Sequence, residues 1–183
     1  MLFRLFLVCL IVFTIAGCAT KYVVPPGTRT ALVRFQAEGI GPNNNAHFYL
    51  VTPGPECRKY GVHQLAKLGA EWGNKRVSDV RMIGSSGQPD RLRYEREVEA
   101  GRNLRLVASW IPAFNPYEMQ FNVLFAALVD LEAGKQYEVG FDLRENRRGI
   151  RVQELGETNG EITRRDLPLR SVRVYKASDL CDL

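Results

Sequence analysis

The chain has 183 residues, of which 45% are hydrophobic and 25% are charged. These are the fractions of a folded domain with a real core, so the composition excludes an intrinsically disordered protein. The formal net charge of +5 permits contact with anionic lipid or polymer surfaces, but we favour the alternative of a solvated surface of mixed charge.

The N-terminus has the three-part layout of a secretory signal peptide. One positive charge, on Arg4, precedes a nearly unbroken apolar run over residues 5–15, and the small residues Ala16 and Gly17 follow it. The run is shorter than the roughly 20 residues that a permanent membrane-spanning helix needs. We therefore expect cleavage between Gly17 and Cys18. A buried N-terminal helix or a plain anchor is the alternative.

The cleavage site itself carries a more specific pattern. The tetrapeptide Ile15-Ala16-Gly17-Cys18 resembles the lipobox of bacterial lipoproteins. The resemblance implies a diacylglyceryl thioether on Cys18 and an acylated amine after cleavage, and several acyl chains together hold a protein stably on a membrane. The next residue is Ala19 and not Asp, which resembles the lipoproteins sorted to the outer membrane; retention in the inner membrane is the alternative.

The predicted mature chain consists of a short tether and one domain. We expect residues 1–17 to be removed, residues 18–27 to form a lipidated tether that ends in a Pro-Pro-Gly turn, and residues 28–183 to fold. This length suits one domain with its own core. The domain would face the periplasm, and that compartment disfavours nucleic acid as a partner.

Apolar and polar residues alternate over many short segments of the domain, which predicts half-buried β-strands. Residues 62–68 differ, because their apolar residues fit one or two helical turns that end at Gly69. Many strands and little helix indicate an all-β antiparallel sandwich with one short helical segment. The expected strands are 28–36, 48–52, 75–83, 91–98, 104–110, 120–131, 137–143, 150–155 and 171–176.

Two of these strands have distinctive compositions. Residues 120–131 are the most apolar stretch of the mature chain and are expected to form a central strand. Residues 91–98 are rich in charge: Glu95, Glu97 and (just beyond) Glu99 lie on one strand face by alternation, and Arg91, Arg93 and Arg96 are close to them in the sequence. We expect a solvated edge strand there, since charge at an edge guards against aggregation; paired carboxylates for acid–base catalysis are the alternative.

Two segments of the domain repeat one another. Residues 98–106 and 131–139 both read as strand, Ala-Gly, basic residue and strand. Gly101 and Gly134 are therefore expected to form equivalent hairpin turns, because glycine adopts positive φ at little cost. Together with the lipobox, these turns resemble a broad group of bacterial lipoproteins that have no established activity. That resemblance implies an immunoglobulin-like or transthyretin-like sandwich and provides no catalytic residues to carry over.

The sequence contains no strong pattern for catalysis, a metal or a cofactor. The only two histidines, His47 and His63, have no zinc-type ligand spacing, even with Cys57 included. Residues 84–87 are one residue short of a Gly-x-Ser-x-Gly nucleophile elbow. We therefore expect a non-enzymatic protein without cofactor or metal that binds an envelope protein partner or supports an envelope assembly.

An alternative function comes from a set of aromatic residues. Trp110, Phe114 and Tyr117 lie in a predicted loop between core strands. Aromatic side chains on a rigid loop make good binding anchors, and with Arg147 and Arg148 nearby they suggest a polysaccharide or peptidoglycan site. The competing interpretation, which we prefer, is that the aromatics cap one end of the sandwich and that the arginines are solvated turn residues. The second arginine pair, residues 164–165, is interpreted in the same way.

Two cysteines remain for a disulfide bond, because Cys9 leaves with the signal peptide and Cys18 is acylated. The periplasm is oxidising, and an even pair of cysteines there is usually bonded, so we predict a bond between Cys57 and Cys181. Two free buried thiols, or a bond to a partner chain, are the alternatives. Closing so long a loop is worth at most about 5 kcal/mol in the chain-entropy model.

Overall fold

The computed structural model describes residues 20–41, 44–53, 60–69, 78–85, 90, 92–112, 123–144 and 149–174. Within these ranges the chain forms eleven strands and no helix. The strands are β1 (Thr20–Lys21), β2 (Thr30–Glu38), β3 (Asn44–Pro53), β4 (Tyr60–Gly69), β5 (Arg93–Glu99), β6 (Gly101–Pro112), β7 (Val123–Leu131), β8 (Gln136–Asp142), β9 (Gly149–Thr158), β10 (Glu161–Asp166) and β11 (Arg170–Val174).

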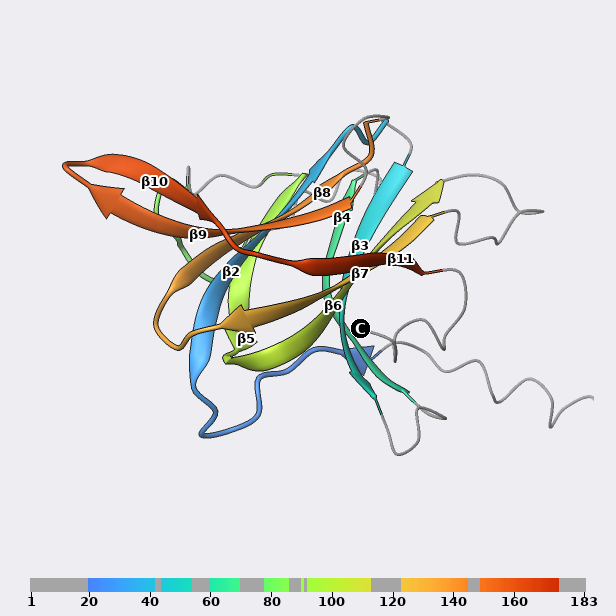
Figure 1. The fold of residues 1–183 in the computed structure, drawn as a ribbon, viewed down its shortest axis with the longest axis horizontal. Helices are drawn as coiled ribbons and strands as arrows, with labels where there is room; N and C mark the ends of the chain where they lie inside the picture. Colours follow the sequence, from blue (N-terminus) through green and yellow to red (C-terminus); the bar gives the residue numbers. More distant parts are fainter. Residues whose placement is uncertain are drawn as a thin grey trace, which may run out of the picture.

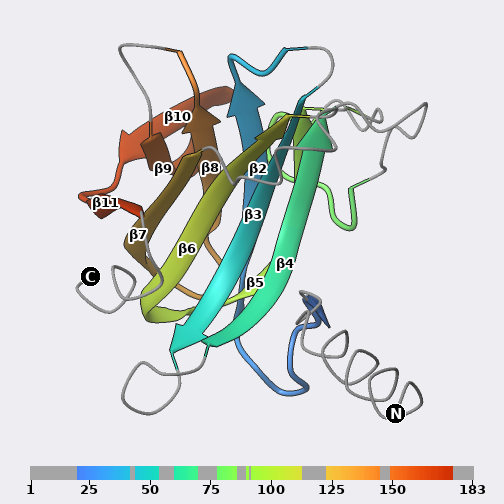
Figure 2. The ribbon, with the colours of Figure 1, turned by 90° about the vertical axis from the view of Figure 1, so that its right-hand side faces the viewer.

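The strands form two sheets that pack face to face, as Figures 1 and 2 show. One sheet has six strands in the order β1-β4-β3-β6-β7-β11, and the other has five in the order β10-β9-β8-β2-β5. The expected all-β, sandwich-like class is confirmed. Most neighbouring strands are antiparallel as expected, but β1 pairs with β4 and β2 pairs with β8 in parallel. The apolar stretch that was expected to be central is β7, which lies between β6 and β11.

The core lies between the sheets and is built from alternate residues of each strand. Phe35 of β2 and Phe141 of β8 point inward from the five-stranded sheet, and neither is exposed. The ring of Phe48 on β3 lies 5.1 Å from that of Phe35 and 6.3 Å from that of Phe141, so one aromatic side chain joins the two sheets. Burial of alternate apolar residues in this way is what the period-two pattern predicts.

The short helix expected over residues 62–68 is wrong, because this segment belongs to strand β4. The register with β3 shifts between Phe48, which faces Ala66, and Tyr49, which faces Gln64. Leu65 is therefore the extra residue of a β-bulge, and both Leu65 and Ala66 are buried, at 2% and 3% exposure. The bulge breaks the strand alternation, and this break produced the helix-like spacing in the sequence.

The strand expected over residues 75–83 is also wrong where the structure describes it. Residues 78–85, which we call the strap, have no strand structure and contain a turn in which Ser85 N donates to Met82 O at 3.0 Å. The strap lies over the outer face of the five-stranded sheet. Side chains of that sheet accept hydrogen bonds from the backbone of the strap: Met82 N donates to Glu95 Oε2, and Ile83 N donates to Gln136 Oε1.

The two Ala-Gly repeats are not hairpins. Gly101 is part of strand β6, and the positive φ near it is that of Asn103, at 53°. Both segments cross between the sheets, from β5 to β6 and from β7 to β8. Both segments also form hydrogen bonds to the start of β2: Ala100 N donates to Arg29 O and Gly134 N donates to Thr30 O, each at 2.8 Å. The repeat in the sequence thus marks two similar crossings of the sandwich.

The described part of the expected tether is packed against the domain. Strand β1 pairs with β4, and Tyr22 is only 3% exposed in the core. The Arg96 guanidinium lies 5.0 Å from the centre of the Tyr22 ring and donates hydrogen bonds of 2.9 Å to Tyr22 O and Leu65 O. Residues 20–24 therefore belong to the folded unit, although the strand pattern of the sequence begins only at residue 28.

Across the described ranges, no helix has the length and apolar character needed to cross a membrane. Several residues on which sequence predictions depend lie outside these ranges, so the corresponding predictions stay predictions: Cys9, Gly17, Cys18, Cys57, Cys181, Phe114, Tyr117, Arg147 and Arg148.

Candidate functional site

Of the residues predicted to bind a ligand, the structure describes only Trp110. It lies in strand β6, opposite Ala46 of β3 and Val123 of β7, and not in a loop as expected. Its side chain is partly buried and packs against the hydrophobic core. Its Nε1 atom is buried without a hydrogen-bond partner among the described residues. Trp110 is therefore part of the sandwich, and its ring is not displayed as an exposed anchor.

The most deeply buried charges of the described residues form a cluster that the sequence analysis missed. Strands β5, β2 and β8 are neighbours, and their registers place Arg34 between Glu95 and Glu138 on the outer face of the sheet. Arg34 Nε lies 2.8 Å from Glu95 Oε1, and Arg34 Nη1 lies 3.4 Å from Glu138 Oε2. The three residues are only 1%, 0% and 5% exposed.

The strap covers this cluster and binds to it directly. Arg34 Nη2 donates to Ile83 O at 2.5 Å, and Met82 N donates to Glu95 Oε2 at 3.2 Å. Strand β5 lies at the edge of its sheet, as expected, but the solvation expected at Glu95 is wrong. The strap removes this carboxylate from water, and Arg34 and the Met82 amide replace its hydration. Since buried charges are tolerated only when they are paired and hydrogen-bonded, the cluster fixes the strap to the sheet.

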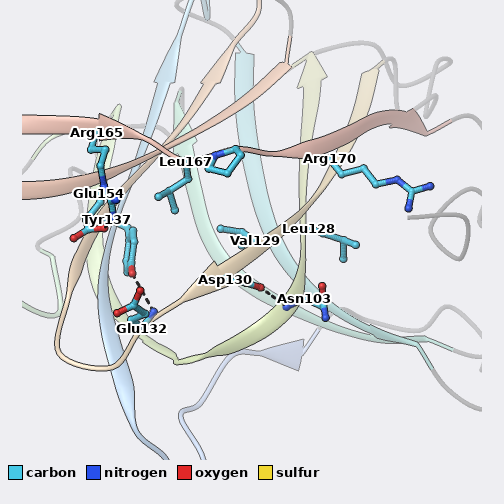
Figure 3. A pocket seen from close by; sticks show the side chains of 11 residues that line it. Asn103, Leu128, Val129, Asp130, Glu132, Tyr137, Glu154, Arg165, Leu167 and Arg170 are labelled. Carbon is cyan, nitrogen blue, oxygen red and sulfur yellow. Dashed lines mark hydrogen bonds and ion pairs between the residues drawn. The ribbon is translucent and has the colours of Figure 1, made fainter.

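A cleft of about 530 Å³ opens between the sheets, on the side where β7, β9 and β10 meet (Figure 3). Figure 3 shows two polar groups: one formed by Glu132, Tyr137, Glu154 and Arg165, the other by Asn103 and Asp130, while the side chain of Arg170 extends away from both. Apolar side chains lie between these groups. The described lining consists of Asn103, Leu128, Val129, Asp130, Glu132, Tyr137, Glu154, Arg165, Leu167, Pro168 and Arg170.

The charged groups of the cleft are held in place by one another. Glu154 forms an ion pair with Arg165, and Lys135 Nζ lies 3.3 Å from Glu154 Oε1. The hydrogen bond from Arg165, with that from Lys135, lowers the pKa of Glu154, so this carboxylate stays ionised. The Tyr137 hydroxyl accepts a hydrogen bond from Glu132 N at 3.0 Å, and burial raises its pKa. The cleft thus presents fixed charges of both signs.

This arrangement is suited to holding a charged chain by ion pairs and hydrogen bonds. The described lining residues include carboxylates and arginines but no serine, cysteine or histidine. Among the residues that the structure describes, no three His, Cys, Asp or Glu side chains are grouped closely enough to hold a metal ion. Tyrosine and arginine are the residue types that most often carry binding energy at protein interfaces.

Strand β10 borders the cleft and projects from the sandwich. It is joined to β9 by the turn at Asn159 and Gly160, whose φ angles of 54° and 79° are those of a type I′ hairpin. All six residues of β10 are exposed, and Figure 1 shows the hairpin reaching beyond the other strands. Arg164 and Arg165, expected in a solvated turn, lie in this strand. Arg165 pairs with Glu154 on the cleft side, whereas Arg164 Nε lies 3.5 Å from Glu138 on the outer face.

No protein family, no curated protein and no solved structure matches the chain. Function therefore has to be inferred from the residues and their geometry.

Proposed function

We propose that this protein is a non-enzymatic, lipid-anchored lipoprotein of the cell envelope that binds a protein partner through the cleft. The cleft is the single observation that carries the proposal. It combines the fixed ion pair of Glu154 and Arg165 with the carboxylates of Asp130 and Glu132, and it lies beside a projecting hairpin. A partner segment with charges of both signs fits such a lining, because complementary charges supply specificity and steer the encounter.

The proposed anchor is the acylated Cys18, on the periplasmic face of the outer membrane. The support for it is the signal peptide and lipobox pattern of residues 1–18. Since strand β1 begins at Thr20 and Tyr22 is in the core, an acylated Cys18 would hold the sandwich directly at the membrane surface. The partner would then be a protein of the same membrane surface or of the adjacent periplasm.

Photo-crosslinking in cells tests the cleft. A photoreactive residue in place of Asn103, which lines the cleft, is expected to give a discrete adduct with another protein, whereas the same residue in place of Glu97, exposed on the outer face of β5, is not. Glu132→Arg reverses a charge of the cleft and should weaken the Asn103 adduct; Glu97→Arg should leave it unchanged. Equal adducts from both positions would contradict the proposal.

The alternative, a polysaccharide or peptidoglycan module built on Trp110, Phe114 and Tyr117, gains no support from the described residues. Trp110 is partly buried and packs against the core, so its ring is not displayed as an exposed anchor for a sugar. Phe114 and Tyr117 lie outside the described residues.

For the sandwich we propose the immunoglobulin-like or transthyretin-like kind that the lipoprotein resemblance implies. It is supported by two packed, mostly antiparallel sheets and by a chain that crosses repeatedly between them.

We also propose the disulfide bond between Cys57 and Cys181. Pro53, four residues before Cys57, and Val174, seven residues before Cys181, are three strands apart in the sheet and offset by about six residues, which is roughly 25 Å. The eleven residues that lead from Pro53 and Val174 to the cysteines span at most roughly 37 Å, so the bond is within reach. Mass mapping without reductant should yield one peptide pair joined through both cysteines. Free alkylation of the Cys57 peptide under the same conditions would exclude the bond.

A further inference from the structure

The outer edge of β10 is open for pairing with another strand. Among the strands that the structure describes, β10 pairs only with β9, and all its residues are exposed. The opposite edge strand, β5, is by contrast covered by the strap, in which Asp79 N donates to Glu95 O at 2.9 Å. Unpaired N–H and C=O groups at a sheet edge are a template for a further strand.

The hairpin geometry determines which residues of β10 offer these groups. In a two-residue type I′ hairpin the residues that flank the turn, here Thr158 and Glu161, form a hydrogen-bonded pair. Hydrogen-bonded and non-hydrogen-bonded pairs then alternate along the strand. The backbone groups of residues 161, 163 and 165 therefore point to β9, and those of residues 162, 164 and 166 point to the free edge.

These positions restrict how two copies of β10 can pair antiparallel. Outward groups must face outward groups, so two-fold registers centred on a residue are allowed, and those centred between residues are not. Registers centred on Glu161, Arg164, Arg165 or Asp166 place that charged residue opposite its own copy, which opposes like charges. In the register centred on Ile162, Arg164 and Arg165 would face the turn residues Gly160 and Asn159 of the second copy, so most of the strand would have no strand partner.

The register centred on Thr163 is self-complementary in charge. It places Glu161 of each copy opposite Arg165 of the other, and opposite charges in such cross-strand pairs are stabilising. Arg165 would then lie between its own Glu154 and the Glu161 of the second copy. On the other face, Ile162 would cover the aliphatic part of the second copy's Arg164.

We propose that a second copy of this chain docks on β10 in the Thr163 register, which gives a two-fold dimer with one continuous sheet. Charges on an edge strand usually oppose pairing. Here only the Thr163 register brings opposite charges together with no like charges facing each other. In the other registers like charges face each other or most of the strand is unpaired, so the charges select a single arrangement. A two-fold pairing also closes on itself and does not propagate into a fibre. The inference is independent of the proposed partner, because its tests use only the purified protein.

Disulfide trapping tests the register on the full-length protein in detergent. In the Thr163 register the two Thr163 Cα atoms form a non-hydrogen-bonded pair about 4.5 Å apart, which is within the range of a disulfide bond. On mild oxidation, Thr163→Cys is expected to form a covalent dimer several times faster than Arg164→Cys. Arg164 is the matched control because it is the next residue and is also exposed. The unsubstituted chain gives the background rate that is due to the native cysteines. Equal rates, or faster trapping through position 164, would overturn the proposal.

Charge exchange provides a second test that needs no cysteine. Glu161→Arg and Arg165→Glu should each shift the protein to monomer in sedimentation equilibrium. In a dimer of either variant, residues 161 and 165 of the two copies would carry the same charge and repel each other. A mixture of the two should recover dimer, since both cross-strand pairs are then attractive. Recovery also shows that both variants are folded. A monomeric unsubstituted protein at all concentrations, or a mixture that stays monomeric, would refute the dimer.

Discussion

Arg34→Ala is expected to lower the free energy of unfolding by about 3–5 kcal/mol, because it leaves the buried Glu95 without its charged partner and Glu138 with only the longer ion pair to Arg164. Glu95 and Glu138 are 0% and 5% exposed and both form ion pairs with Arg34. The substitution also removes the hydrogen bond from Arg34 to Ile83 O, by which the strap is held. Urea denaturation, followed by circular dichroism, measures the loss.

Arg144→Ala is the matched control for this experiment. Arg144 also pairs with two carboxylates, Glu38 and Asp142, at 2.5 Å and 2.6 Å, but its side chain is 52% exposed. Exposed ion pairs contribute only about 0–1 kcal/mol, so the control should lose little stability. Adding Glu95→Gln and Glu138→Gln to an Arg34→Met variant should recover part of the stability, because no charge then stays buried. Similar losses for Arg34→Ala and Arg144→Ala would show that burial does not determine the cost.

Cys18→Ser is expected to abolish stable attachment of the mature protein to membranes. Serine cannot carry the thioether-linked diacylglyceryl group, and without several acyl chains the domain has no strong hydrophobic anchor. Fractionation of cells, followed by mass analysis of the N-terminus, measures both processing and attachment. A correctly cleaved Cys18→Ser protein that still sediments with membranes would refute the lipid anchor.

Ala19→Asp separates sorting from attachment. It leaves Cys18 available for acylation, so the protein should stay on membranes but move from the outer to the inner membrane. An unchanged distribution between the two membranes would show that residue 19 does not determine the destination.

The strands that the sequence predicts well are those with one buried and one polar face. Residues 28–36 and 137–143 alternate clearly, and they correspond to β2 and β8. The turn at Asn159 and Gly160 also has a local cause, because this pair of residues favours positive φ. Strand β10 was missed because its six residues are all exposed, and a strand without a buried face has no alternation to detect.

The lipid anchor at Cys18 was predicted from local pattern alone, and it is independent of how the domain packs. The cleft and the buried cluster depend on tertiary structure. Arg34 and Glu97 both lie on polar faces of alternating strands, yet Arg34 is 1% exposed and Glu97 is exposed. Arg34 is buried because the strap covers it and because it forms ion pairs with Glu95 and Glu138, which lie 61 and 104 positions further along the chain. Strand periodicity shows that a strand has two faces, but only long-range packing decides whether a polar face meets water or another part of the protein.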